Sequence, residues 1–121
     1  MNEPSLTVPG AMWHVTITLN GEPVTANRMT VGLADLELSH PFALAARYSP
    51  DTVELRYWDE GHDCAAVVKN ALRLWDQHRS GAKLPAWPVV GLEILDRATF
   101  QRRWPRGSDP QGLLVPGVRP L

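Results

Sequence analysis

"FALAARYSPDTVELRYW", residues 42–58, is the stretch of sequence that decides the fold. Apolar side chains alternate with smaller or polar ones on both sides of a central turn, at Phe42, Leu44, Ala46, Tyr48, Val53, Leu55 and Tyr57. This period of two predicts two strands. Pro50 occupies the second position of the turn at residues 49–52, a position that proline favours in type I turns. Because so short a turn joins antiparallel strands, the stretch predicts a hairpin.

A strand and a helix are expected before the hairpin. The run WHVTITL, residues 13–19, alternates in the same way, with one side formed by Trp13, Val15, Ile17 and Leu19. Apolar residues then recur at helical spacing, at Ala26, Met29, Leu33 and Leu36. Since Pro41 ends this segment, we expect a helix over residues 26–39. Asn20-Gly21 is also a strong hairpin signal, which leaves a second strand over residues 23–26 as the alternative.

A longer helix and a last strand are expected after the hairpin. Asp63 precedes the helix, at about residues 63–80, as its N-cap, and Gly81 is a candidate left-handed cap at its end. The apolar stripe of this helix is predicted to contain Cys64, Val67, Val68, Ala71, Leu72 and Trp75. The run VVGLEILDR, residues 89–97, predicts a strand with an inward row of Val90, Leu92 and Ile94.

The predicted order is strand, helix, strand, strand, helix, strand, which is the α+β, ferredoxin-like βαββαβ pattern. Right-handed connections then place both helices on one face of a four-stranded antiparallel sheet in the order 4-1-3-2. We expect an N-terminal arm at residues 1–11, the folded domain at 12–100 and a basic tail at 101–121. The tail contains four Pro and three Gly, so it is expected to be largely irregular.

Composition describes an ordinary globular chain. The 121 residues are 44% hydrophobic and 21% charged, and a net charge of −1 gives no general case for nucleic acid or membrane binding. The charge is uneven, because residues 1–100 hold eight Lys and Arg against twelve Asp and Glu, whereas the tail holds four Arg against one Asp. No run approaches about 18 apolar residues, and Cys64 is the single cysteine. We therefore expect a soluble cytoplasmic protein, and ten Arg against two Lys suggest a high-GC bacterium.

Three segments carry a resemblance to a known group. ELRYW, ALRLWDQHRSGAKLPAW and VVGLEILDR resemble small uncharacterised ferredoxin-like proteins of high-GC bacteria, over roughly residues 42–97. That group has no assigned activity, so the resemblance implies one folded unit and carries over no functional residue.

The sheet face that the helices leave uncovered is the first candidate site. Its interface or ligand candidates are His14, Thr16, Thr18, Arg47, Glu54, Arg56, Trp58 and Glu93. Thr side chains are short enough for another flat surface to approach, and an exposed Trp58 would anchor an interface. We therefore expect an interaction or regulatory module that forms a homo-oligomer, with a dimer favoured. A solvated sheet face is the alternative.

Two other functions stay open, and a metal site is disfavoured. A cavity on this face, with His14, Glu54 and Arg56 as its polar groups, would make the chain a small-ligand binder or an enzyme. Arg102, Arg103 and Arg106 could bind an anion or nucleic acid, although nucleic acid is disfavoured because the body is acidic. Residues 59–64 gather carboxylates, His62 and Cys64 without a metal-ligand spacing, and Cys64 is expected in the core. We predict no metal, cofactor or catalytic residue.

Overall fold

The structure, a computed structural model, describes residues 10–40, 43–105 and 116–121. It is a mixed α+β fold with the elements β1 (Ala11–Asn20), α1 (Ala26–Ser39), β2 (Leu44–Ser49), β3 (Thr52–Gly61), α2 (Cys64–Ala82), β4 (Val89–Asp96), α3 (Arg97–Arg103) and β5 (Gly117–Pro120). The predicted order of the first six elements is confirmed, including a helix over residues 26–39. The alternative strand over residues 23–26 is wrong.

The sheet has five strands in the order β4-β1-β3-β2-β5. The four antiparallel strands follow the predicted order 4-1-3-2, but the prediction of only four strands is wrong, because β5 pairs in parallel with β2. The prediction of a largely irregular tail is also wrong for the parts that the structure describes, since the last three residues of α3 and the whole of β5 lie there. Without β5, strand β2 would present a row of unpaired backbone groups. Leu121 N–H extends the pairing by donating to the Tyr48 carbonyl at 2.7 Å.

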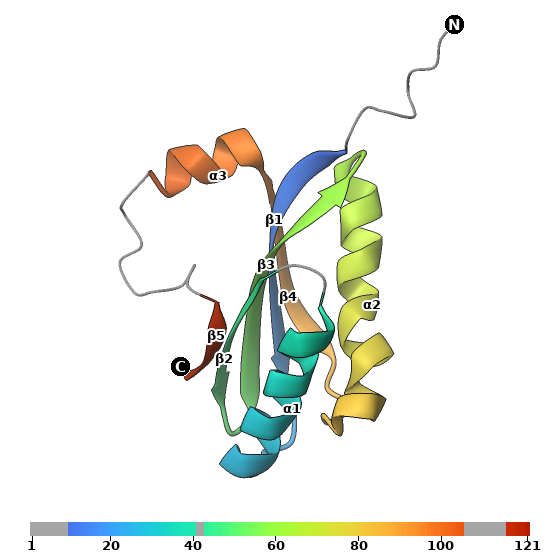
Figure 1. The fold of residues 1–121 in the computed structure, drawn as a ribbon, viewed down its shortest axis with the longest axis vertical. Coiled ribbons are helices and arrows are strands. Elements are labelled where there is room, and N and C mark those ends of the chain that lie inside the picture. Colours follow the sequence, from blue (N-terminus) through green and yellow to red (C-terminus); the bar gives the residue numbers. More distant parts are fainter. Residues whose placement is uncertain (1–9, 41–42, 106–115) are drawn as a thin grey trace, which may run out of the picture.

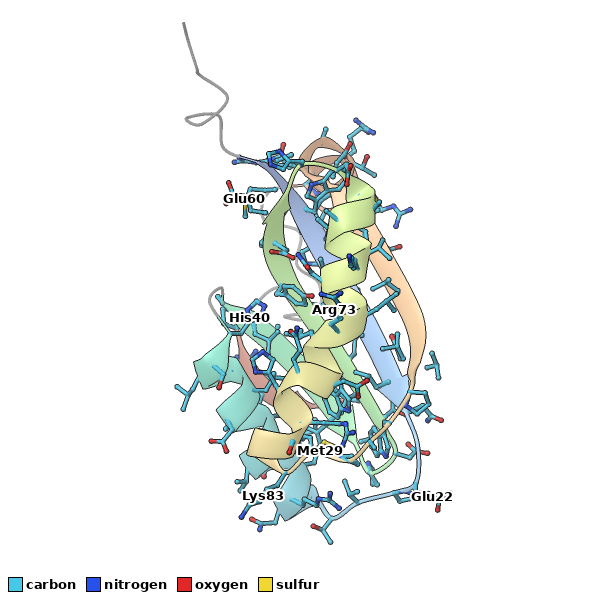
Figure 2. All side chains as sticks on the ribbon, turned by 90° about the vertical axis from the view of Figure 1, so that its right-hand side faces the viewer. Glu22, Met29, His40, Glu60, Arg73 and Lys83 are labelled. Atoms are coloured by element: carbon cyan, nitrogen blue, oxygen red, sulfur yellow. The ribbon has the colours of Figure 1, made fainter. Side chains whose placement is uncertain are left out.

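Helices α1 and α2 cover one face of the sheet, as predicted, and α3 lies against the other face (Figure 1). Helix α1 packs on β2 and β5, whereas α2 packs on β1, β3 and β4, so the two helices divide the sheet between them (Figure 2). The core lies between these helices and the inward rows of the strands, including Val15, Ile17, Leu33, Leu55 and Trp75. None of the helices that the structure describes has the length and apolarity needed to cross a membrane.

Helix α2 begins where the sequence predicts and ends differently. The Asp63 carboxylate accepts the Ala66 backbone N–H at 2.9 Å, as expected of an N-cap. The left-handed cap is Lys83, with φ of 59°, and Gly81 lies inside the helix. The predictions that Cys64 and Leu72 are buried are wrong, because both are exposed. The buried line of α2 consists of Val67, Ala71, Leu74, Trp75 and Ala82.

Strand β4 carries an irregularity that the alternating pattern hides. Leu19 pairs with Val89 and Thr18 pairs with Gly91, so Val90 is an extra residue in β4. Val89 packs against the core in its place, and Val90 is 59% exposed. The prediction that Val90 belongs to the inward row is therefore wrong.

Two tryptophan side chains form hydrogen bonds to the loops that precede α1 and follow α2. The Trp75 indole donates to the Pro85 carbonyl at 2.7 Å, and the Trp87 indole donates to the Glu22 carbonyl at 3.1 Å. Gly21 lies so close to the Trp87 ring that a side chain at this position would clash with it. Asn20-Gly21 therefore serves this close contact instead of a hairpin turn.

Gly32 and Gly81 give a stability prediction with a matched control. A Cβ at Gly32 would clash with the buried Leu84 side chain and lie 3.0 Å from the Ala82 carbonyl oxygen, whereas a Cβ at Gly81 would meet nothing within 4 Å. Gly32→Ala should lower the free energy of unfolding by about 1–3 kcal/mol through overpacking. Gly81→Ala should raise it by up to about 1 kcal/mol through helix propensity. Urea denaturation of both variants measures whether each substitution lowers or raises the free energy of unfolding. If both variants were stabilised equally, the close packing at Gly32 of α1 would be contradicted.

Candidate functional site

The candidate site lies on the second face of the sheet, the face opposite α1 and α2. Three central strands bring polar side chains together there. In the strand register His14 lies between Trp58 and Leu95, and the next residue on this face, Thr16, lies between Arg56 and Glu93. Thr18 follows, opposite Glu54 on β3. The alternation in the sequence thus placed these candidates on one face correctly.

Helix α3 covers one end of the second face. Phe100, the buried residue of α3, has its ring centroid 4.3 Å from that of His14 and 4.7 Å from that of Trp58. At the far end of α3, the Arg103 guanidinium forms an ion pair of 2.8 Å with Glu93. The expectation of a fully uncovered face is therefore wrong at this end, and Trp58 packs within its own chain.

The helix that makes this cover was missed in the sequence, although one signal was present. Asp96 is an N-cap residue, because its carboxylate accepts the Thr99 backbone N–H at 2.7 Å. Hydrogen bonds from Thr99 are the main cause that lowers the pKa of Asp96. An Asp at a strand end, followed four residues later by an apolar Phe100, is the pattern of a short helix that folds back on the sheet.

Two polar side chains at the centre of the face are buried, and the hydroxyl of one of them has no hydrogen-bond partner in the described part of the chain. The exposed fraction is 3% for His14 and 9% for Thr16. The Thr16 hydroxyl is buried without a partner, and the His14 imidazole packs against the rings of Trp58 and Phe100. A buried polar group without a partner costs about 1–3 kcal/mol, so bound water or a ligand is expected at such groups.

The imidazole of His14 is kept neutral by its surroundings. Burial lowers its pKa from 6.5 to about 4, and the positive charge of Arg56 acts in the same direction. Glu93 opposes them with a smaller effect. At neutral pH, His14 therefore offers one hydrogen-bond donor and one acceptor.

A small cavity of about 70 Å³ opens beside His14. It is lined by His14, Ala43, Ala45, Arg56, Tyr57, Trp58 and Pro116. The Arg56 side chain is only 14% exposed, and its Nε atom contacts a Glu54 carboxylate oxygen at 3.2 Å. A water molecule needs about 10–15 Å³ of such space, so the cavity has room for a group of several atoms. Beyond Trp58, a wider groove of about 370 Å³ is lined by Met12, Trp58, Arg97, Phe100 and Gln101.

The remaining candidates lie away from this cavity or outside the described residues. Arg47 stands opposite Glu54 on β3 and Arg119 on β5. In the proposed anion site of the tail, the Arg102 guanidinium donates to the Thr99 hydroxyl at 3.3 Å, whereas Arg103 pairs with Glu93. Arg106 lies outside the described residues. Within the described ranges, no three His, Cys, Asp or Glu side chains gather as metal ligands, at residues 59–64 or elsewhere.

Comparison with known proteins places the chain in a family. The profile described as Domain of unknown function (DUF8830) matches residues 12–111. The chain belongs to this family. Among curated proteins none matches it in sequence. One similar solved structure is titled "Structure of the REP associates tyrosine transposase bound to a REP hairpin", with 16% identity, a TM-score of 0.43, and coverage of 85% of this chain and 67% of that one. A likeness this loose assigns no function.

The low pKa of His14 predicts how stability depends on pH. The pKa of His14 in the folded protein is about 4, below 6.5, so the unfolded chain binds the proton more tightly. The contribution of His14 is therefore complete above pH 6.5 and is lost as the pH falls toward 4, by about 3 kcal/mol. Urea denaturation between pH 7 and pH 4 should show this loss in the native protein and in the control His62→Gln, an exposed histidine. The His14→Phe variant should lose less stability over the same range, and an unchanged dependence would show that His14 is not buried as a neutral ring.

Proposed function

We propose that this chain is a small binding module that holds a small oxyanion-bearing molecule, such as a carboxylate, on the second face of a ferredoxin-like core. The observation that carries the proposal is the Thr16 hydroxyl, which is buried without a hydrogen-bond partner opposite Arg56. On the same face, the buried His14 imidazole and Arg56 line a cavity. Natural proteins satisfy almost all buried polar groups, so an unsatisfied buried hydroxyl near a cavity suggests a missing partner.

The chemistry of the lining favours an oxyanion. Arg56 uses its Nε atom on Glu54, and a guanidinium has further N–H donors that can bind two oxygens of a planar carboxylate. Neutral His14 in the lining and Thr16 opposite Arg56 add uncharged donors, and the Trp58 ring supplies an apolar wall. At His14 the field of Arg56 outweighs that of Glu93, which favours a negative group there.

Self-association through this whole face has less support. His14 and Thr16 are buried within one chain, and Trp58 packs against Phe100. A flat partner would therefore not reach His14 or Thr16, and the Trp58 ring is already engaged by Phe100. The cavity supports a binding site of the size of a small ligand or of the head group of a larger one.

Binding can be tested with the free protein and simple anions. Backbone amide NMR spectra recorded during titration with acetate, phosphate or chloride should show saturable shifts at His14, Thr16 and Phe100 for at least one oxyanion. Arg56→Gln should weaken that binding by roughly tenfold or more, because a hydrogen bond to a charged group contributes about 1.5–3 kcal/mol.

The control is Arg73→Gln, because Arg73 is an exposed arginine of α2, on the other side of the sheet (Figure 2). This variant should bind like the native protein. The proposal is wrong if no oxyanion gives saturable shifts at the second face, or if Arg56→Gln, folded as judged by its spectrum, binds as tightly as the native protein.

A further inference from the structure

Strand β4 forms one edge of the sheet and offers a surface that the proposed binding site does not use. Its neighbour in the described structure is β1, and no described strand pairs with its outer side. Edge strands present unpaired N–H and C=O groups, which natural proteins protect with Lys, Pro or bulges. Beyond the bulge at Val90, the segment 91–96 pairs regularly with β1 and contains neither Lys nor Pro.

The surroundings of this edge are apolar. Val90 is 59% exposed, and Leu92 and Ile94 are only partly buried although they face the core. Leu72 on α2 is 49% exposed. Gln77, His78 and Gly81 line the groove between α2 and α1, so the helical period places Leu72 on the flank of α2 away from α1. Helix α2 packs on β4, so this flank lies on the side of the edge strand (Figure 2).

We propose that β4 pairs antiparallel with β4 of a second copy of this chain, around a twofold axis at Leu92. Such an isologous pairing needs a strand that is complementary to itself. With Leu92 at the axis, Leu92 faces Leu92 of the second copy. Val90, the exposed extra residue of the bulge, then stands opposite Ile94 of the second copy, so apolar side chains meet across the two chains. On the other face, Glu93 stands opposite Gly91, which has no side chain to clash with it.

Charge selects this register over its neighbour. An axis at Glu93 would place two carboxylates directly opposite each other, which is destabilising in an antiparallel pair. At the Leu92 axis no charged residue of the segment 90–94 faces another charge. Glu93 is also neutralised within its own chain by Arg103 at 2.8 Å, so its approach to the second copy requires no further counter-charge.

The same axis brings the exposed flank of α2 into the interface. A twofold axis perpendicular to the sheet keeps the α2 helices of both copies on one face of a continuous sheet. Because α2 is the helix that packs on β4, the two Leu72 flanks then approach each other across the axis. Apolar burial is thereby added to the backbone hydrogen bonds, which alone would make a small interface.

The test is the molecular mass of the full chain in solution, measured by sedimentation over a range of concentrations. The native protein should sediment as a dimer that dissociates on dilution. Val90→Asp places a charge against Ile94 of the second copy and should raise the dissociation constant roughly tenfold or more. The matched control is Val31→Asp, since Val31 on α1 is 56% exposed and lies far from β4 in the sheet order. This control should leave the dimer unchanged.

Hydrogen exchange gives a second measurement that does not depend on a variant. Backbone amides within residues 91–96 that point away from β1 should exchange more slowly at high protein concentration. A native protein that is monomeric at all concentrations overturns the proposal. A dimer that Val90→Asp and Val31→Asp leave equally intact, with no concentration-dependent protection in β4, also overturns it, because the interface then lies elsewhere.

Discussion

The antiparallel pairing of β1 with β3 is the constraint on which the rest of the structure depends. It runs without a break from Ala11 opposite Gly61 to Asn20 opposite Thr52. Opposed residues share a face, so this register sends Val15, Ile17 and Leu19 into the core and leaves the alternate residues on the second face. A slip of one residue would exchange the two rows and expose the core. The same register that secures the core therefore also gathers His14, Thr16 and Arg56.

The sequence predicted those elements whose formation depends on residues that are close together in the chain. The turn at residues 49–52, the cap at Asp63 and the helical spacing over residues 26–39 each specify structure within a few positions, and the structure has all three. By contrast, α3 and β5 are too short to be stable alone. They exist because Phe100 packs on the rings of His14 and Trp58, and because β2 offers an edge to pair with. Apart from the N-cap residue Asp96, no local sequence pattern predicts contacts of that kind.

The candidate site shows the same division. Alternation alone placed His14, Thr16, Thr18, Glu54 and Arg56 on one face, since a strand has only two sides. It could not predict that a later helix buries His14, or that burial and Arg56 keep its ring neutral. Bulges are equally hidden, because one inserted residue, here Val90, reverses the parity that the sequence suggests.

Asp96 links the cavity on the second face to the edge strand β4. This residue is the last one of β4 and also caps α3, while Glu93 of β4 holds Arg103 at the other end of that helix. Strand β4 and helix α3 are thus joined by contacts at both ends of the helix, so a shift of β4 would also move α3. If dimerisation through β4 shifts α3, ligand binding in the cavity and the association of two chains are coupled by a free energy. Linkage makes that coupling reciprocal, so each process alters the equilibrium of the other by the same factor.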